Sequence, residues 1–360
     1  LGQGVATAVG MAMAARYERG LLDPDAPAHT SIFDHSIWVI CSDGDLQEGV
    51  SAEAHSLAGT QELGNLNIIY DDNRISIEGD THNAFTEDVS ARYRAYGWHV
   101  IEVAATTNGS VDLVALDAAM TAAKNQTAKP TLIRMSSVIA WPAPKAQGTA
   151  ASHGSALGEE EVRATKLALG LNPDEHFAMP PEILSHARLV KERGAQSRMQ
   201  WDAKFESWKS AHADKAALLE RLRTRGLPTG WDSDIPVFAT GKDVATRAAS
   251  GEVINAIAAK LPEFWGGSSD LAGSNNTSIK GGGSFLPSSS SIEGADPYGR
   301  IIHFGIREHA MGSILNGITL HGLTRSFGGT FAVFSDYMRP AVRLAALMNI
   351  ASTFVWTHDS

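Results

Sequence analysis

The sequence contains a single cysteine, Cys41, in 360 residues. One cysteine can form neither an intrachain disulfide nor a zinc site of several thiolates, which excludes a disulfide-stabilised scaffold. An isolated thiol is typical of a reducing compartment and predicts a cytoplasmic protein. Long hydrophobic runs are missing as well, because the apolar stretches fall short of the roughly 18 residues that a membrane-spanning helix needs. We therefore expect no membrane association.

Basic residues are scarce relative to acidic ones. The chain has 30 Lys and Arg against 40 Asp and Glu, which gives a formal net charge of −10. A nucleic-acid-binding protein usually carries a basic excess, so we expect no nucleic-acid partner. Hydrophobic residues make up 43% and charged residues 19% of the chain. These proportions are typical of a folded globular protein, and the length predicts two or three domains.

Short apolar runs alternate with helical patterns in the first part of the chain. Strands are expected at residues 36–41, 65–70, 98–103 and 131–135, and helices at 4–17, 50–58 and 111–124. This alternation favours a parallel sheet covered by helices. Residues 159–225 then become charged and helical in pattern, and we expect residues 212–236 to form a linker.

A second alternating pattern follows the linker. Helices are expected at residues 243–261, 307–321 and 335–349, and strands at 263–268, 300–304 and 353–357. The Gly/Ser-rich stretch 281–291 predicts a mobile surface loop. The sequence thus predicts an α/β protein with two doubly wound parallel-sheet domains, at residues 1–211 and 237–360. Because the chain opens at Leu1 without Met and stops at Ser360 inside an ordered pattern, we expect an internal part of a longer protein. A targeting segment further upstream stays open.

Polar residues follow two successive predicted strands. Asp43 and Gly44 come after the first strand, and Asn73 comes after the second. Ligands of open parallel sheets bind beyond the carboxyl ends of the strands, so Asp43 and Asn73 are expected side by side there. A carboxylate and an amide oxygen suit Mg²⁺ or Ca²⁺ when a phosphate supplies further ligands, and glycine lets a phosphate approach the backbone closely. An Asp-Gly pair by itself is usually only a turn; the spacing to Asn73 favours the metal site.

These segments resemble the transketolases, a family of thiamine diphosphate-dependent enzymes. The resemblance is carried by residues 43–49, 56–60 and 70–79. One departure is Ser42, which stands where the family's Gly-Asp-Gly motif has its first glycine. The resemblance implies that the side chains of Asp43 and Asn73 and the backbone carbonyl of Ile75 bind Mg²⁺, for which Ca²⁺ or Mn²⁺ can substitute. It also implies that Gly44 and Asn73 contact the diphosphate of the cofactor.

Two segments of the second half carry further family motifs. The charged triplet at 307–309, with Glu308 at its centre, would in most proteins be a solvated helix cap. Phe331, Phe334 and Tyr337, spaced by three residues on a helix-like turn, would ordinarily be a core stripe. The resemblance implies instead that Glu308 is catalytic, because it hydrogen-bonds the aminopyrimidine of the cofactor and so promotes loss of the thiazolium proton. It also implies that the three aromatic rings surround that pyrimidine, with Phe334 stacking on it.

Other segments resemble those that contact phosphorylated sugars in the family. They imply that Arg247, Ser274 and His358 bind the substrate phosphate, for which Arg, Ser and His are suitable donors. They also imply that His153 touches the diphosphate and the substrate and assists proton transfer. Without the resemblance, each lone histidine would be interpreted as a surface residue or a satisfied core residue. The remaining histidines, such as His55, gain nothing from the match and are expected to be structural.

The activity implied by the resemblance is transfer of a two-carbon ketol group in the pentose phosphate pathway. The donor would be a ketose phosphate such as xylulose 5-phosphate, and the acceptor an aldose phosphate such as ribose 5-phosphate or erythrose 4-phosphate. A homodimer is implied, because the family binds diphosphate and pyrimidine with domains of different subunits. The alternatives are a dihydroxyacetone synthase, a deoxyxylulose phosphate synthase and a non-catalytic dimerisation module. The last has no reason to retain Glu308 beside a complete aromatic set.

Overall fold

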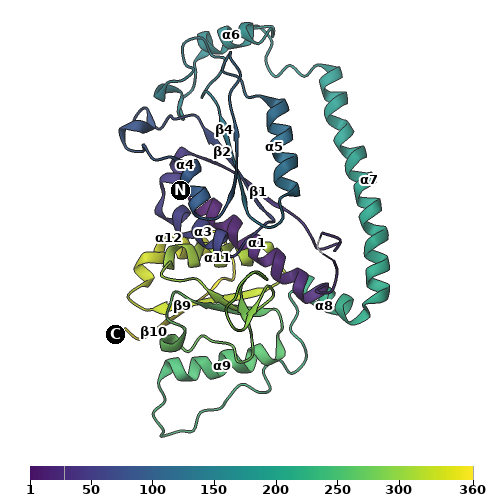
Figure 1. The fold of residues 1–360 in the computed structure, drawn as a ribbon, viewed down its shortest axis with the longest axis vertical. Helices are drawn as coiled ribbons and strands as arrows, with labels where there is room; N and C mark the ends of the chain where they lie inside the picture. Colours follow the sequence, from purple (N-terminus) through teal and green to yellow (C-terminus); the bar gives the residue numbers. More distant parts are fainter. Residues whose placement is uncertain (28, 360) are drawn as a thin grey trace.

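Two parallel sheets, one in each half of the chain, organise the fold (Figure 1). The computed structural model describes residues 1–27 and 29–359. The first sheet has the strand order β1-β2-β4-β3, and the second has the order β10-β9-β5-β8-β6-β7. Every pair of neighbouring strands in the two sheets is parallel. The predicted α/β class with two parallel-sheet domains is confirmed.

The elements of the first sheet follow the predicted alternation closely. Its strands are β1 (Ile37–Ser42), β2 (Leu66–Asp72), β3 (His99–Val103) and β4 (Thr131–Ser136). The helices around it are α1 (Gln3–Leu22), α2 (Asp43–Gln47), α3 (Gly49–Thr60), α4 (Val89–Ala95) and α5 (Leu113–Asn125), with 3-10 turns at Thr81–Asn83 and Ala150–Ser152. Strand β2 is buried on both faces along most of its length, as its nearly continuous apolar run predicts for a parallel sheet.

Three helices connect the two sheets. They are α6 (Glu159–Ala168), the long α7 (Pro181–Ala211) and α8 (Ala213–Arg223). Helix α7 begins on a proline, which suits the first turn of a helix, and runs along one side of the first domain in Figure 1. Helix α8 occupies the start of the stretch predicted as a linker and packs against the first domain through the buried Leu219, which shares a cluster with Leu22 of α1. The Lys215 Nζ donates to the carbonyl of Leu21 over 2.7 Å.

The second sheet is built from shorter strands. They are β5 (Phe264–Ser268), β6 (Ser284–Phe285), β7 (Ala295–Asp296), β8 (Ile301–His303), β9 (Arg325–Phe331) and β10 (Thr353–Thr357). The accompanying helices are α9 (Thr246–Lys260), α10 (Ala272–Asn275), α11 (Glu308–His321) and α12 (Ser335–Leu347). Within the described part of the chain, no helix is both long enough and apolar enough to cross a membrane.

Two expectations about the second half are wrong. The Gly/Ser-rich stretch 281–291 is not a surface loop throughout, because it contains β6 and places Phe285 in the main hydrophobic core at 0% exposure. The segment from Phe331 to Tyr337 is not one helical turn. Phe331 ends strand β9, Phe334 is the N-cap of α12, and Tyr337 lies in that helix. The glycines inside β9 conceal the strand, because glycine is depleted in strands and lowers any prediction of one.

Helices α1 and α11 cross between the two sheets and hold the halves together (Figure 1). The crossing is close at Gly10 of α1 and Gly317 of α11: a Cβ atom built on Gly10 would lie 2.1 Å from the carbonyl oxygen of Ile314, and one on Gly317 would lie 2.0 Å from that of Thr7. One continuous hydrophobic core therefore includes residues of both halves.

Candidate functional site

The first group of predicted site residues lies at the carboxyl ends of β1 and β2. These strands are paired in parallel, with Ser42 opposite Asp71. Asp43 follows β1 and begins helix α2, and Asn73 follows β2. A hydrogen bond from the hydroxyl of Tyr70, on β2, to the Asp43 carboxylate joins the two segments. The structure thus brings Asp43 and the Asn73 segment to one edge of the sheet, as the spacing predicts.

One oxygen of the Asp43 carboxylate is buried without a partner. Asp43 is only 3% exposed, and its Oδ1 accepts a hydrogen bond of 2.7 Å from the Tyr70 hydroxyl. No hydrogen-bond donor meets its buried Oδ2 among the described residues. Burial raises the pKa of the Asp43 carboxyl, and the hydrogen bond from Tyr70 opposes that rise. An orphaned buried carboxylate oxygen is a position where a hard cation fits, because a cation would supply the missing charge.

The Asn73 segment forms a local turn beside this carboxylate. The Asn73 Oδ1 accepts from the backbone amide of Ile75 over 3.0 Å, which fixes the backbone that carries the Ile75 carbonyl. The described residues contain no group of three or more His, Cys, Asp or Glu side chains able to hold a metal. A cation at Asp43 would therefore complete its coordination with amide, backbone and ligand oxygens. A cavity of about 220 Å³ adjoins the site; its walls include Asp43, Tyr70, Asp72, Arg74 and Arg134.

Gly44 leaves open space at the start of α2. A Cβ atom built there would meet no other atom of the chain within 4 Å. Nothing in the surrounding fold requires glycine at this position, so the space next to the backbone is available to a ligand.

The second group of predicted residues lies at the carboxyl ends of strands in the second sheet. The rings of Phe331 and Phe334 have centroids 5.7 Å apart, and those of Phe334 and Tyr337 are 5.8 Å apart. The His358 ring meets Phe331 edge-on, with centroids 5.1 Å apart, and also hydrogen-bonds the guanidinium of Arg247. Tyr337 is 64% exposed. The structure therefore gathers four of these residues and Arg247 into one aromatic and basic cluster that opens to the surface.

The remaining substrate candidates are exposed. Ser274 lies in α10, where the neighbouring Asn275 hydrogen-bonds Thr357 at the end of β10, one residue before His358. Ser274 therefore belongs to the same edge of the second sheet as His358. His153 follows a 3-10 turn in an exposed loop of the first domain.

Glu308 lies apart from both groups, where the domains meet. It is the first residue of α11 and is 9% exposed. A second carboxylate approaches the same helix end from α3: the Glu53 Oε2 accepts from the backbone amide of Ala310 over 3.0 Å. Burial and the nearby charge of Glu308 raise the pKa of Glu53, while the Ala310 amide opposes that rise. Sequence reasoning missed Glu53, because its partners are more than 250 residues away along the chain.

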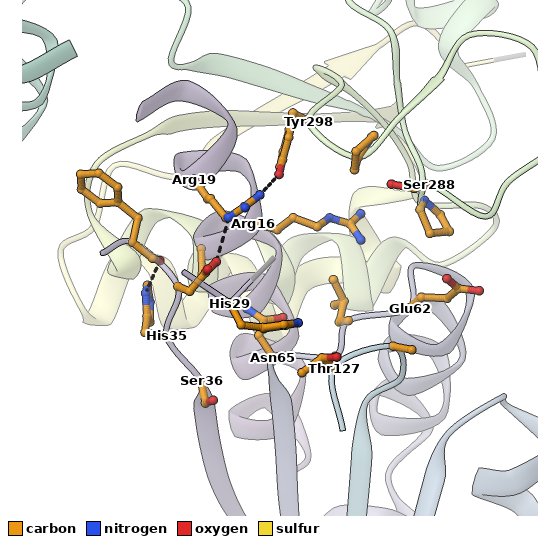
Figure 2. Close-up of a pocket in the computed structure, with 18 of the residues that line it drawn as sticks. Arg16, Arg19, His29, His35, Ser36, Glu62, Asn65, Thr127, Ser288 and Tyr298 are labelled. Atoms are coloured by element: carbon orange, nitrogen blue, oxygen red, sulfur yellow. Dashed lines mark hydrogen bonds and ion pairs between the residues drawn. The ribbon is translucent and has the colours of Figure 1, made fainter. Parts of the chain in front are cut away.

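The cavity drawn in Figure 2 does not contain the predicted site. Figure 2 shows a cavity of about 930 Å³ whose walls include Arg16, Arg19, His35 and Tyr298. Arg19 is engaged there by an ion pair of 2.8 Å with Asp34. Burial lowers the pKa of Arg16 to about 10. None of the predicted site residues lines this cavity.

The fold and the two groups define a class of protein. Both parallel-sheet domains are similar to domains of thiamine diphosphate-binding proteins. Residues 1–228 match the family model for the thiamine diphosphate binding domain of transketolase, and residues 242–360 match the one for its pyrimidine binding domain. The chain belongs to the transketolase family.

Individual relatives agree with this assignment. The transketolase of Mycobacterium leprae is 55% identical over 363 residues, which cover 100% of this chain and 51% of the relative. The transketolase of Bacillus subtilis is 45% identical over 361 residues and is covered to 52%. A crystal structure of a Pichia stipitis transketolase in complex with sedoheptulose-7-phosphate has a TM-score of 0.93 at 42% identity, covering 100% of this chain and 52% of that one. The chain spans about half the length of these relatives.

Proposed function

We propose that the protein is a transketolase, which transfers a two-carbon ketol group from a ketose phosphate to an aldose phosphate. The observation that carries the proposal is that one chain contains both the orphaned Asp43 carboxylate at the first sheet edge and Glu308 with the aromatic cluster in the second domain. The sugar phosphate named for the Pichia stipitis relative supports the same substrate class.

Asp43, Asn73 and Ile75 are the residues that would hold the cation of the cofactor. The free Oδ2 of Asp43 supplies a charged ligand, and the turn at Asn73 presents an amide oxygen and the Ile75 carbonyl. This all-oxygen set suits Mg²⁺, with Ca²⁺ or Mn²⁺ as substitutes. The open space at Gly44 leaves room for the diphosphate.

Glu308 would hold a proton at the aminopyrimidine nitrogen of the cofactor. When bound, thiamine diphosphate supplies the carbon that carries the two-carbon group. Phe331, Phe334 and Tyr337 would surround the pyrimidine, and the exposure of Tyr337 in one chain leaves that ring accessible to it. The buried position of Glu308 at a helix N-terminus keeps its carboxylate close to the positive end of the helix dipole.

Arg247, Ser274 and His358 would bind the phosphate of the sugar. The guanidinium and the imidazole already contact each other at the edge of the second sheet, so both can reach one dianion. His153, on its exposed loop, would contact diphosphate and substrate and move a proton to or from a sugar oxygen.

The two groups of residues support a homodimeric enzyme with shared sites, and the single cysteine supports its placement in the cytoplasm. The cavity beside Asp43 contains no member of the second group, and the cavities lined by Arg16 and by Leu222 contain no member of either group. A site that needs both would form where the first domain of one subunit meets the second domain of another. We also divide the chain into domains at 1–211 and 237–360; the gap between the two family-model matches, after residue 228 and before residue 242, supports a boundary in this region.

The test is the Glu308→Gln variant of the full-length protein, assayed with xylulose 5-phosphate and ribose 5-phosphate. Glutamine keeps the shape but cannot hold the cofactor nitrogen in its protonated form. We expect kcat to fall by about two orders of magnitude or more, as for loss of a general acid–base group. Hydrogen–deuterium exchange at the thiazolium carbon of bound cofactor should slow in parallel.

Wild-type protein that lacks ketol transfer between sugar phosphates would contradict the proposed function. Exchange that stays fast in Glu308→Gln while turnover collapses would show that Glu308 acts later in the cycle. If neither quantity changes, the 307–309 triplet is an ordinary helix cap.

A further inference from the structure

The Tyr70 hydroxyl lies between two carboxylates at the edge of the first sheet. It is 2.7 Å from the Oδ1 of Asp43 and 3.3 Å from the Oδ1 of Asp72, and the tyrosine is 2% exposed. Tyr70 and Asp72 are two residues apart on β2, so their side chains point to the same face of the sheet. A phenol has a single proton to donate, and the shorter distance assigns it to Asp43.

Arg134 neutralises the second carboxylate. It lies on β4 directly opposite Tyr70, and both its Nε and its Nη2 are 2.7 Å from the Oδ2 of Asp72. Asp72 therefore has a cationic partner inside the protein. Asp43 forms no ion pair with any described side chain, and its hydrogen bond comes from a neutral donor, the Tyr70 hydroxyl.

The arrangement leaves the two oxygens of Asp43 with different tasks. Oδ1 is held by Tyr70, and Oδ2 is buried without a partner. Without the bond at Oδ1, the carboxylate could rotate about its last side-chain torsion, which is broad for aspartate. A ligand oxygen that rotates freely must be ordered when a metal binds, and the cost of ordering it lowers the affinity for the metal.

We propose that Tyr70 is a positioning residue for the cation site: its hydroxyl holds one oxygen of Asp43 and thereby presents the other to the divalent metal. The inference rests on the proposed function, because it assumes a cation at Asp43. It adds a residue that touches neither metal nor substrate, on the strand that precedes the Asn73 turn.

The experiment compares Tyr70→Phe with Tyr93→Phe in the full-length protein. Each change removes only a hydroxyl from a buried tyrosine of the first domain; that of Tyr93 bonds His55 rather than a site residue. Binding of Mn²⁺ in the presence of thiamine diphosphate is followed by electron paramagnetic resonance. We expect Tyr70→Phe to bind Mn²⁺ about 10- to 100-fold more weakly, as for other residues that orient metal ligands, and Tyr93→Phe to bind it as the wild type does.

Steady-state kinetics with varied Mg²⁺ provide the second readout. The half-saturating Mg²⁺ concentration should rise in Tyr70→Phe, whereas kcat at saturating Mg²⁺ should stay near that of the wild type. Unchanged Mn²⁺ affinity in Tyr70→Phe, or equal weakening in Tyr93→Phe, would overturn the inference while leaving the proposed function intact. Wild-type protein that binds no Mn²⁺ with thiamine diphosphate would instead overturn the proposed cation site itself.

Discussion

His55 shows how a single buried side chain can make folding depend on pH. It is 1% exposed, its Nδ1 hydrogen-bonds the Tyr93 hydroxyl, and the Trp98 ring lies edge-on to it. Burial, reinforced by the nearby positive charge of Arg92, lowers the pKa of His55 to about 3. The folded protein therefore keeps this ring neutral over a pH range in which the unfolded chain protonates it.

The sign of the effect follows from this difference. Below the ordinary histidine pKa of about 6.5, the unfolded state binds a proton at His55 and the folded state does not. The free energy of unfolding therefore falls as the pH falls. This single group should contribute a slope of about 1.4 kcal/mol per pH unit between roughly pH 6 and pH 4. We expect His55→Gln to be less stable at neutral pH. Its free energy of unfolding should depend less steeply on pH than that of the wild type, as measured by urea unfolding across that range.

His186→Gln is the matched control, because His186 is exposed on α7. Its unfolding free energy should change with pH as that of the wild type does. Equal slopes for wild type and His55→Gln would show that the buried ring takes up its proton without loss of the fold.

At the scale of elements, the crossing of α1 and α11 depends on two glycines. Cβ atoms added at Gly10 and Gly317 would clash with backbone carbonyl oxygens of the facing helix, at distances of 2.1 and 2.0 Å. The helices would have to separate, and this crossing joins the two domains. We expect Gly317→Ala to lower the free energy of unfolding by about 1–3 kcal/mol or more, as overpacking does in other cores.

Gly194 provides the comparison for that prediction. It also lies inside a helix, α7, but a Cβ atom built there meets nothing within 4 Å. Alanine is the better helix former by about 1 kcal/mol, so Gly194→Ala should leave stability unchanged or raise it. Thermal unfolding of both variants by calorimetry separates the outcomes, and a Gly317→Ala protein as stable as Gly194→Ala would refute the close crossing.

For the whole molecule, the arrangement of the two half-sites predicts complementation between subunits. Asp43, proposed to bind the metal, and Glu308, proposed to be catalytic, lie in different domains, and we propose that each site joins domains of two chains. In a dimer of one Asp43→Ala and one Glu308→Gln subunit, one site then carries both changes and the other carries neither. Two inactive proteins should regain activity when they are unfolded and refolded together, to about a quarter of the wild-type rate for random pairing.

The same experiment distinguishes sites shared between two chains from sites formed within one chain. If each site were formed within one chain, both sites of the mixed dimer would carry a change and the mixture would stay inactive. Each variant refolded alone provides the baseline for the comparison.

Local sequence was sufficient for the four strands of the first sheet and for the common edge at which Asp43 and Asn73 lie. The apolar run 65–70 forms a strand because its side chains are stable only when both faces are buried, as they are in a parallel sheet covered by helices. The spacing of Asp43 and Asn73 predicted their common edge, because neighbouring parallel strands end at the same side of a sheet. The glycine-rich β9 and the buried Phe285 were missed, since only pairing and packing with distant strands make those segments regular.

Tertiary structure alone decided which side chains meet. The Tyr70 hydroxyl on Asp43, Arg134 on Asp72 and Glu53 at the start of α11 join residues from 27 to 257 positions apart. No local pattern records such pairs, because each depends on how whole strands and helices are ordered in space. The sequence by itself determined the residue types and the ends of the strands where chemistry can occur. The pairing of β1 with β2 decided that Asp43 keeps one oxygen free, and the packing of the domains decided that Glu308 is buried beside a second carboxylate.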